Sequence, residues 1–301
     1  MRYIERKLFP ERVKRREARE QIKADDERRE EEARLTYRNS ISNSKDYLSK
    51  LPFIENSEVV TLDEEMGTRI QMYSAPRSSQ TVLLVPGYGS TGQSRKYDWL
   101  IADLLRNGVS VVRANNEPKI NIRSDEYDSN IAYVSRHQEL YKRYMEKHLK
   151  LISMFMSDNG IISSDKNFHI IASSAGATAV LALHGLFDVS PESLILLGPS
   201  GDIAKQDAIS AAEAYIAERG EIQMVVGQFD GFQNTEPFTS LAQMSGVNAS
   251  RIAFADHELR DPDKDGGFVQ IGLHREIFKT IHLPYEQFDL ICSGFQYVKA
   301  L

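Results

Sequence analysis

The sequence predicts an α/β fold: a doubly wound, mostly parallel sheet with helices on both faces. Strand-like apolar segments alternate with helical segments from about residue 57 to residue 285, which is the pattern of strands joined by helical crossovers. The strand segment Thr81–Val85 is a continuous apolar run after its first residue, as expected of a strand buried on both faces. Turns rich in small residues follow several strands, and sheets of this kind bind ligands at the carboxyl ends of their strands.

The composition predicts a cytoplasmic protein with one large domain. The chain has 301 residues, of which 41% are hydrophobic, and its net charge of −6 argues against a general nucleic-acid binder. It contains no apolar run of about 18 residues, so no membrane span is predicted. Its start, Met1–Lys7, lacks the apolar core of a secretory signal. Cys292 is the only cysteine, so neither a disulfide framework nor a multi-cysteine metal site is expected, and no cofactor is predicted.

Residues 1–48 form a charged arm, and residues 49–301 are predicted to form the sheet domain. The segment Glu11–Arg38 is dense in charged helix formers and predicts one long, exposed helix. Residues 1–38 carry 13 basic and 10 acidic side chains, a charge of +3, while the remainder carries −9. Two interpretations stay open: a solvated helix laced by ion pairs, or an arm for self-association or for an acidic protein partner that binds the basic patch Arg12–Arg19.

The strands and helices are expected at the following places. The strands are Glu58–Leu62, Thr68–Tyr73, Thr81–Val85, Val109–Val112, Phe168–Ile171, Leu194–Leu197, Ile222–Val226 and Ile252–Ala255. The helices are Tyr97–Arg106, Ile131–Met156, Ala177–Phe187, Ala204–Arg219, Phe238–Met244 and His274–Ile281. The first two strands flank a turn and predict a hairpin. Only one helix fits between residues 198 and 221, so no cap domain is expected there.

A serine follows the strand Phe168–Ile171 at the start of a small-residue helix. A serine on such a tight strand-to-helix turn is forced outward, where its hydroxyl can attack a carbonyl. The turn is crowded, so the residues two before and two after Ser174 must be small, and they are Ala172 and Gly176. The helix that follows favours negative charge at its amino end. The alternative is an ordinary strand-to-helix turn capped by a serine.

Other candidate residues also follow strands: Gly87 and Tyr88, Asp230, and His257. With Ser174 they appear in the chain order nucleophile, acid, histidine. Because parallel strands end at one edge of the sheet, we expect these residues to lie near each other.

This pattern resembles the α/β-hydrolase family, over about three-quarters of the chain. The motifs that carry the resemblance are Pro86-Gly87-Tyr88-Gly89, Ala172-Ser173-Ser174-Ala175-Gly176, Gly227-Gln228-Phe229-Asp230 and Ala255-Asp256-His257. The chain departs from the family pattern at Ala172, where a glycine is usual, and at Pro86-Gly87, where His-Gly is common.

The resemblance implies a role for each candidate residue. Ser174 would be the nucleophile, His257 the general base, and Asp230 the acid that orients the imidazole. The backbone N–H groups of Tyr88 and Ala175 would form the oxyanion hole.

The sequence leaves rivals to these assignments. Ser173 is the rival nucleophile and Asp202 the rival acid. Three histidines follow Asp230, namely His257, His274 and His282, and His274 is the main rival base. Four further histidines precede Asp230 and lie in expected helices or the central strand: His137, His148, His169 and His184.

The predicted function is a capless serine hydrolase of a carboxylic ester or thioester, or of an amide, acting through an acyl-enzyme. A polar loop over residues 115–130, which begins with Asn115 and Asn116, favours small or polar acyl groups. The rival function is a catalytically silent scaffold that binds a partner through its arm.

Two other ligand-binding patterns fit less well. Residues 87–92 lack the Lys-Ser/Thr of a phosphate-binding loop. The aspartates Asp261, Asp263 and Asp265 resemble half of a calcium loop, but Gly272 stands where a glutamate belongs, which favours a polar turn.

Overall fold

The computed structural model describes residues 57–75, 78–90, 97–120, 130–218, 220–227, 230, 238–252 and 276–283. The predicted arm, the segment with Asp261, Asp263 and Asp265, and both His257 and His274 lie outside the described residues. The domain boundary at residue 48 therefore stays a prediction.

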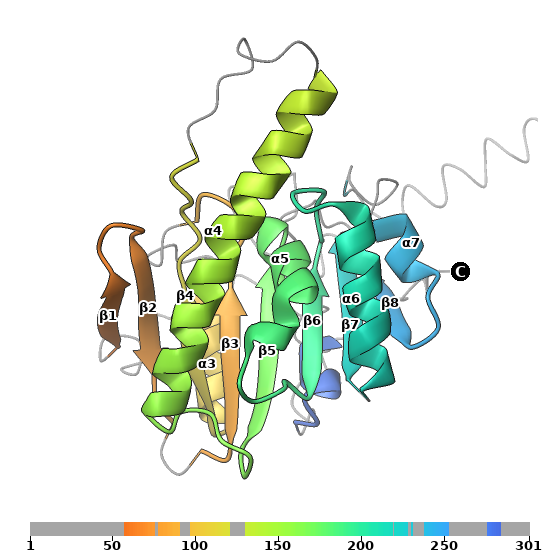
Figure 1. The fold of residues 1–301 in the computed structure, drawn as a ribbon. Coiled ribbons are helices and arrows are strands. Elements are labelled where there is room, and N and C mark those ends of the chain that lie inside the picture. The colour runs from red at the N-terminus through yellow and green to blue at the C-terminus, as the bar shows by residue number, and fades with distance from the viewer. Residues whose placement is uncertain are drawn as a thin grey trace, which may run out of the picture.

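The described residues build one eight-stranded sheet in the order β1-β2-β4-β3-β5-β6-β7-β8 (Figure 1). The strands are β1 (Glu58–Asp63), β2 (Thr68–Tyr73), β3 (Gln80–Val85), β4 (Val109–Ala114), β5 (Asn167–Ser173), β6 (Ser193–Leu197), β7 (Glu221–Gly227) and β8 (Val247–Ile252). β1 and β2 form an antiparallel hairpin, β2 pairs antiparallel with β4, and the remaining pairs are parallel. The predicted mostly parallel sheet with an amino-terminal hairpin is confirmed.

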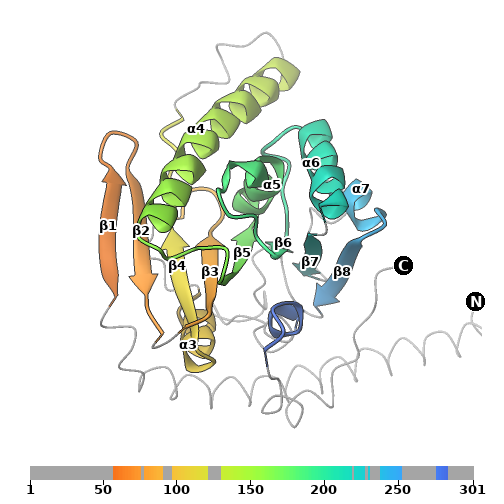
Figure 2. The same cartoon turned by 60° about the horizontal axis from the view of Figure 1, so that its bottom comes forward.

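Helices cover both faces of this sheet. The helices are α3 (Asp98–Arg106), α4 (Asn130–Asp158), α5 (Ala175–Leu183), the 3₁₀ turn His184–Leu186, α6 (Lys205–Ala217), α7 (Phe238–Ala242) and a short helix over residues 276–280. Figure 2 shows α4, α5 and α6 on one side of the sheet, with α3 and the last short helix on the other. The structure is therefore a three-layer α/β arrangement.

The central strands are apolar because each contributes to two cores. In β3, Leu83 and Val85 belong to the cluster that includes side chains of α4 and α5. Val82 and Leu84 belong to the cluster that includes side chains of α3 and of the helix over residues 276–280. Alternate residues of a strand point to opposite faces, so a strand covered on both sides must be apolar throughout.

The last strand differs from its prediction. We expected a strand over Ile252–Ala255, but β8 covers Val247–Ile252, and residues 253–255 lie outside the described part. β8 is the last strand in the order, paired on one side with β7, and of its six residues only Ile252 is buried. An edge strand needs few apolar residues, and the apolar run that we used as a signal marks only its end.

The connection from β6 to β7 contains α6 as its only helix among the described residues, which agrees with the absence of a cap domain at this point. No described helix combines the length and the apolar character that crossing a bilayer requires.

Candidate active site

Ser174 forms the turn between β5 and α5 by itself, because β5 ends at Ser173 and α5 begins at Ala175. Its backbone has φ 51° and ψ −125°, a conformation that residues with a Cβ rarely adopt. The Ser174 N–H donates to Leu197 O (2.8 Å) at the end of β6, and the Ala177 N–H donates to Ser174 O (3.0 Å). These bonds hold a strained strand-to-helix turn of the kind that presents a nucleophile.

The small residues around Ser174 are required by close backbone approaches. A Cβ at Gly176 would lie 2.4 Å from Pro86 O, which is far inside van der Waals contact. A Cβ at Gly87 would lie 3.1 Å from the Ser174 Cβ. Ala172 is fully buried in the sheet. The loop after β3 therefore packs directly on the serine turn.

Ser173 has a structural role. Its side chain is only 5% exposed, and its Oγ accepts a hydrogen bond from Tyr97 Oη (2.7 Å), next to the start of α3. The sequence left Ser173 open as the exposed serine, and the structure places it inside the sheet instead. Ser174 is the serine on the turn.

The proposed oxyanion-hole residues belong to the loop after β3 and to the start of α5. The segment Pro86–Ser90 turns through a hydrogen bond from Ser90 N–H to Gly87 O (3.2 Å). Tyr88 follows Gly87, which touches Ser174. Ala175 opens α5, whose first backbone N–H groups have no partner within the helix. The two backbone N–H groups named from the sequence therefore belong to a residue next to Gly87, which lies close to Ser174, and to the residue that follows Ser174.

The Tyr88 ring is 42% exposed and packs against the amino-terminal half of α4. Its centroid lies 5.4 Å from that of Tyr141 and 5.6 Å from that of His137. Burial, and then the Asp202 carboxylate, raise the pKa of Tyr88 above its ordinary value. Figure 1 shows the amino-terminal end of α4 extending past the end of the sheet, so this helix reaches the edge where the strands β3 and β5 end.

The two candidate acids have different surroundings. Asp230 comes three residues after β7 ends at Gly227, its N–H donates to Gly227 O (3.2 Å), and it is only 1% exposed. Asp202 is partly exposed, and Ser200 Oγ donates to its carboxylate. Asp202 also raises the pKa values of Tyr88 and Tyr141, so it lies toward α4.

Most described histidines lie away from the serine turn. His148 is buried in α4 and His169 in β5, and burial lowers the pKa of each to about 4. His184, after α5, packs edge-on against Tyr215.

His137 is the exception, because its ring contacts Tyr88 in the loop after β3. We set His137 aside in the sequence because it lies in a helix before Asp230. The only local sequence signal for its position was the four-residue spacing of His137 and Tyr141, whose rings stack in the structure.

Asn115 and Asn116 are not part of a polar mouth. They were expected to help line it, yet they are 1% and 0% exposed, and both side chains hydrogen-bond protein groups. Asn115 and Asn116 therefore do not support the predicted preference for small or polar acyl groups.

No metal site is evident in the described part of the chain, where no three His, Cys, Asp or Glu side chains gather closely enough to hold an ion.

Solved structures with the same architecture include three hydrolases. A dienelactone hydrolase from Anabaena variabilis matches with a TM-score of 0.54 at 15% identity, over 76% of this chain and 99% of that chain. An S-formylglutathione hydrolase from Staphylococcus aureus matches with a TM-score of 0.51 at 11% identity, over 75% of this chain and 95% of that chain. An alpha-beta serine hydrolase homologue from Coxiella burnetii has a TM-score of 0.50 at 15% identity, over 75% and 97% of the two chains.

No protein-family model and no curated protein sequence matches this chain. The structural matches confirm that the chain has the α/β-hydrolase fold. At such low identity they carry the fold alone, so the roles of Ser174, Asp230, His257, Tyr88 and Ala175 stay predictions.

Proposed function

We propose that the chain is a serine hydrolase that cleaves a carboxylic ester or thioester through an acyl-enzyme on Ser174. The observation that carries the proposal is the strained backbone of Ser174 on a turn between β5 and α5. Strain of this kind costs free energy, is held in place by the surrounding structure, and clusters at active sites. An α/β-hydrolase fold that binds a partner without catalysis would have no need of it.

In the proposed reaction, His257 removes the Ser174 hydroxyl proton as the oxygen attacks the substrate carbonyl. The tetrahedral intermediate collapses, the bond to the leaving group breaks, and His257 gives the proton to the departing alcohol or thiol. Water then attacks the acyl-enzyme with the same histidine as base, and the acid and free Ser174 are released. Asp230, almost fully buried after β7, would orient His257 and stabilise its charged form.

The negative charge on the carbonyl oxygen would be stabilised by the backbone N–H groups of Tyr88 and Ala175. Both segments pack on the serine turn, and α5 directs its amino end there. Losing one such donor typically costs about 3 kcal/mol of transition-state stabilisation.

The substrate class is supported by chemistry rather than by a pocket. Two of the similar structures are named as hydrolases of a dienelactone and of S-formylglutathione, an ester and a thioester. The same acyl-enzyme chemistry serves amides. The cytoplasmic location and the partner for residues 1–48 also stay proposals from the sequence.

The test is steady-state hydrolysis of p-nitrophenyl acetate and of an acetyl thioester, with the acyl-enzyme detected by intact mass. We expect activity in the full chain and its loss in Ser174→Ala and His257→Ala. His137→Ala is the control, since the His137 ring contacts Tyr88 in the loop after β3. Loss of activity in His137→Ala with activity retained in His257→Ala would contradict the assignment of the base.

A further inference from the structure

Two consecutive buried asparagines connect the end of β4 to different parts of the molecule. Asn115 binds the β1–β2 hairpin: its Oδ1 accepts from the Arg69 N–H (2.7 Å), and its Nδ2 donates to Gly67 O (2.8 Å). Asn116 binds the loop after β3 instead. The pair therefore offers one residue at the candidate site and one matched residue away from it.

Asn116 holds both ends of the segment Pro86–Ser90. Its Nδ2 donates to Pro86 O (2.9 Å) and to Tyr141 Oη (2.8 Å), and its backbone N–H donates to Ser90 O (2.9 Å). Its Oδ1 is buried and accepts no hydrogen bond from the described residues. The two acceptors around Nδ2 fix the orientation of the amide, because the Pro86 carbonyl can only accept.

The Pro86 carbonyl is packed from the other side as well. It lies so close to Gly176, in the first turn of α5, that a Cβ there would approach it to 2.4 Å. The carbonyl is thus held between the Asn116 amide and α5. The next residue, Gly87, lies against Ser174, and the Tyr88 N–H belongs to the peptide that follows.

We infer that Asn116 is a positioning residue for the oxyanion hole, with Tyr141 holding its amide in place. By fixing the peptide before Gly87, the Asn116 amide sets where the Tyr88 N–H points relative to Ser174. The inference rests on the proposed function, because this N–H has an oxyanion to bind only if Ser174 attacks a carbonyl. Misplacing a catalytic group by about 1 Å can cost on the order of 100-fold in rate.

The experiment compares Asn116→Asp, Tyr141→Phe and Asn115→Asp in the full chain. Asn116→Asp keeps the shape of the side chain but, when ionised, cannot donate to Pro86 O. Tyr141→Phe keeps the ring that packs on Tyr88 and removes only the acceptor. Asn115→Asp is the control, since it loses its donor bond to Gly67 O in the hairpin.

The readouts are kcat and KM for p-nitrophenyl acetate and the rate of Ser174 labelling by a fluorophosphonate, with Tm measured for each variant. We expect Asn116→Asp to lower kcat and the labelling rate by about 10-fold or more with little change in KM. We expect Tyr141→Phe to lower both by a smaller factor and Asn115→Asp to leave both within about 2-fold of the starting protein. A loss of stability alone would not separate Asn116 from Asn115 in this way.

If the starting protein is active and both Asn116→Asp and Tyr141→Phe match Asn115→Asp in kcat, the inference is wrong and the proposed function stands. If the starting protein neither hydrolyses the ester nor is labelled, both are wrong. If Asn116→Asp does not fold, Tyr141→Phe decides, and an unchanged labelling rate in that variant overturns the inference.

Discussion

At the scale of the residue, the strained backbone of Ser174 is the central feature. A positive φ suits glycine, and among the described residues with a side chain only Ser174 and His282 adopt it. The bonds to Leu197 O and from the Ala177 N–H hold the strain in place. The molecule thus gives up stability at the residue that we assign as nucleophile.

This strain can be measured as a stability difference between two inactive variants. Ser174→Gly removes the Cβ, whereas Ser174→Ala keeps it, so we expect the glycine variant to be more stable by about 1 kcal/mol. Urea denaturation of both variants gives the comparison. A glycine variant that is less stable than the alanine variant would contradict the strain.

Gly176 tests the contact between α5 and the loop after β3. In Gly176→Ala the new Cβ would meet Pro86 O, so we expect a loss of about 2 kcal/mol or more in stability and weaker labelling of Ser174. Gly185→Ala is the control, because a Cβ at Gly185 meets nothing within 4 Å. Thermal unfolding and fluorophosphonate labelling of the two variants check this, and equal behaviour of the two would be the contrary result.

At the scale of the element, the sequence predicts strands and helices well where burial is two-sided. β3, β5, β6 and β7 lie within two residues of their predicted bounds, because nearly all their residues are buried. β2 has its predicted bounds because its polar and apolar residues alternate. The predicted bounds of β8 differ from the observed ones because an edge strand has few buried apolar residues to mark it. β8 begins at Val247, where its parallel pairing with β7 begins, and a pattern of apolar residues does not show this pairing.

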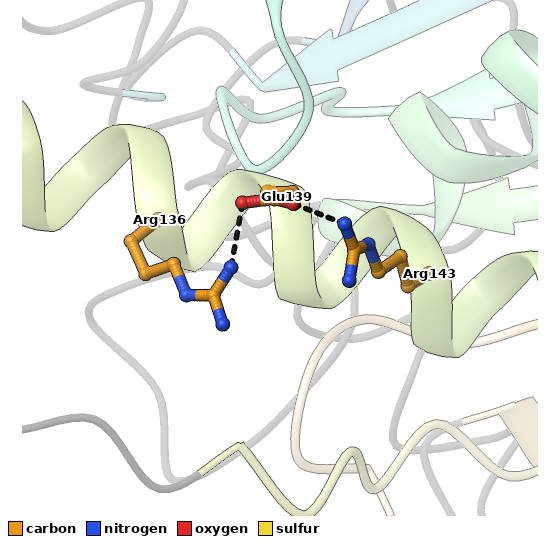
Figure 3. A network of polar contacts seen from close by, with 3 residues as sticks. All are labelled: Arg136, Glu139 and Arg143. Atoms are coloured by element: carbon orange, nitrogen blue, oxygen red, sulfur yellow. Dashed lines mark hydrogen bonds and ion pairs between the residues drawn. The ribbon is translucent and has the colours of Figure 1, made fainter.

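The ion pairs of the molecule differ in how much they stabilise the fold. On the surface of α4, Glu139 accepts from Arg136 Nη1 (2.7 Å) and Arg143 Nη2 (2.5 Å), as Figure 3 shows. The hydrogen bond from Arg136, and then the charge of Arg143, lower the pKa of Glu139. All three side chains are largely exposed, so water screens the network and it contributes little to stability.

The pair between α3 and β4 is different, because Arg113 is only 1% exposed and lies 3.4 Å from Asp98 (Nη1 to Oδ1). Asp98→Asn removes the charge that compensates this buried guanidinium, so we expect a loss of about 2 to 3 kcal/mol. Lys142→Ala breaks the exposed Lys142–Asp207 pair and should cost at most about 1 kcal/mol. Chemical denaturation compares the two, and a smaller effect for Asp98→Asn would contradict the buried role.

At the scale of the whole molecule, His148 and His169 make stability depend on pH. Burial lowers the pKa of both to about 4 in the folded chain, below the value of about 6.5 in the unfolded chain. Between pH 6.5 and 4 the unfolded chain binds more protons, so stability falls as pH falls through this window. We expect each histidine to account for a loss on the order of 2 to 3 kcal/mol.

Tm measured from pH 7 to pH 4 tests this, with His148→Gln and His169→Gln as the comparison. The variants should show a shallower decline than the starting protein over the same window. Parallel pH profiles would mean that the buried histidines do not control acid stability.

The candidate site was predicted from residues that follow strands, because parallel strands end at one edge of the sheet; of these residues the structure describes Gly87, Tyr88, Ser174, Ala175 and Asp230. The turn at Ser174 and its small neighbours are local features that a short stretch of sequence contains. The contacts of Asn116 and His137 could not be predicted, since their partners Pro86 and Tyr88 are distant in sequence and meet only when α4 and β4 pack. Asn115 and Asn116, which we expected at the start of an exposed polar loop, are buried in the structure.

The most direct test of the account is covalent labelling of the folded full chain by a fluorophosphonate, with the modified residue identified by peptide mapping. We predict one adduct on Ser174 that is lost in Ser174→Ala and His257→Ala but retained in Ser173→Ala and His137→Ala. A folded chain that is not labelled, or that is labelled at another residue, would contradict the claim that Ser174 is an activated nucleophile.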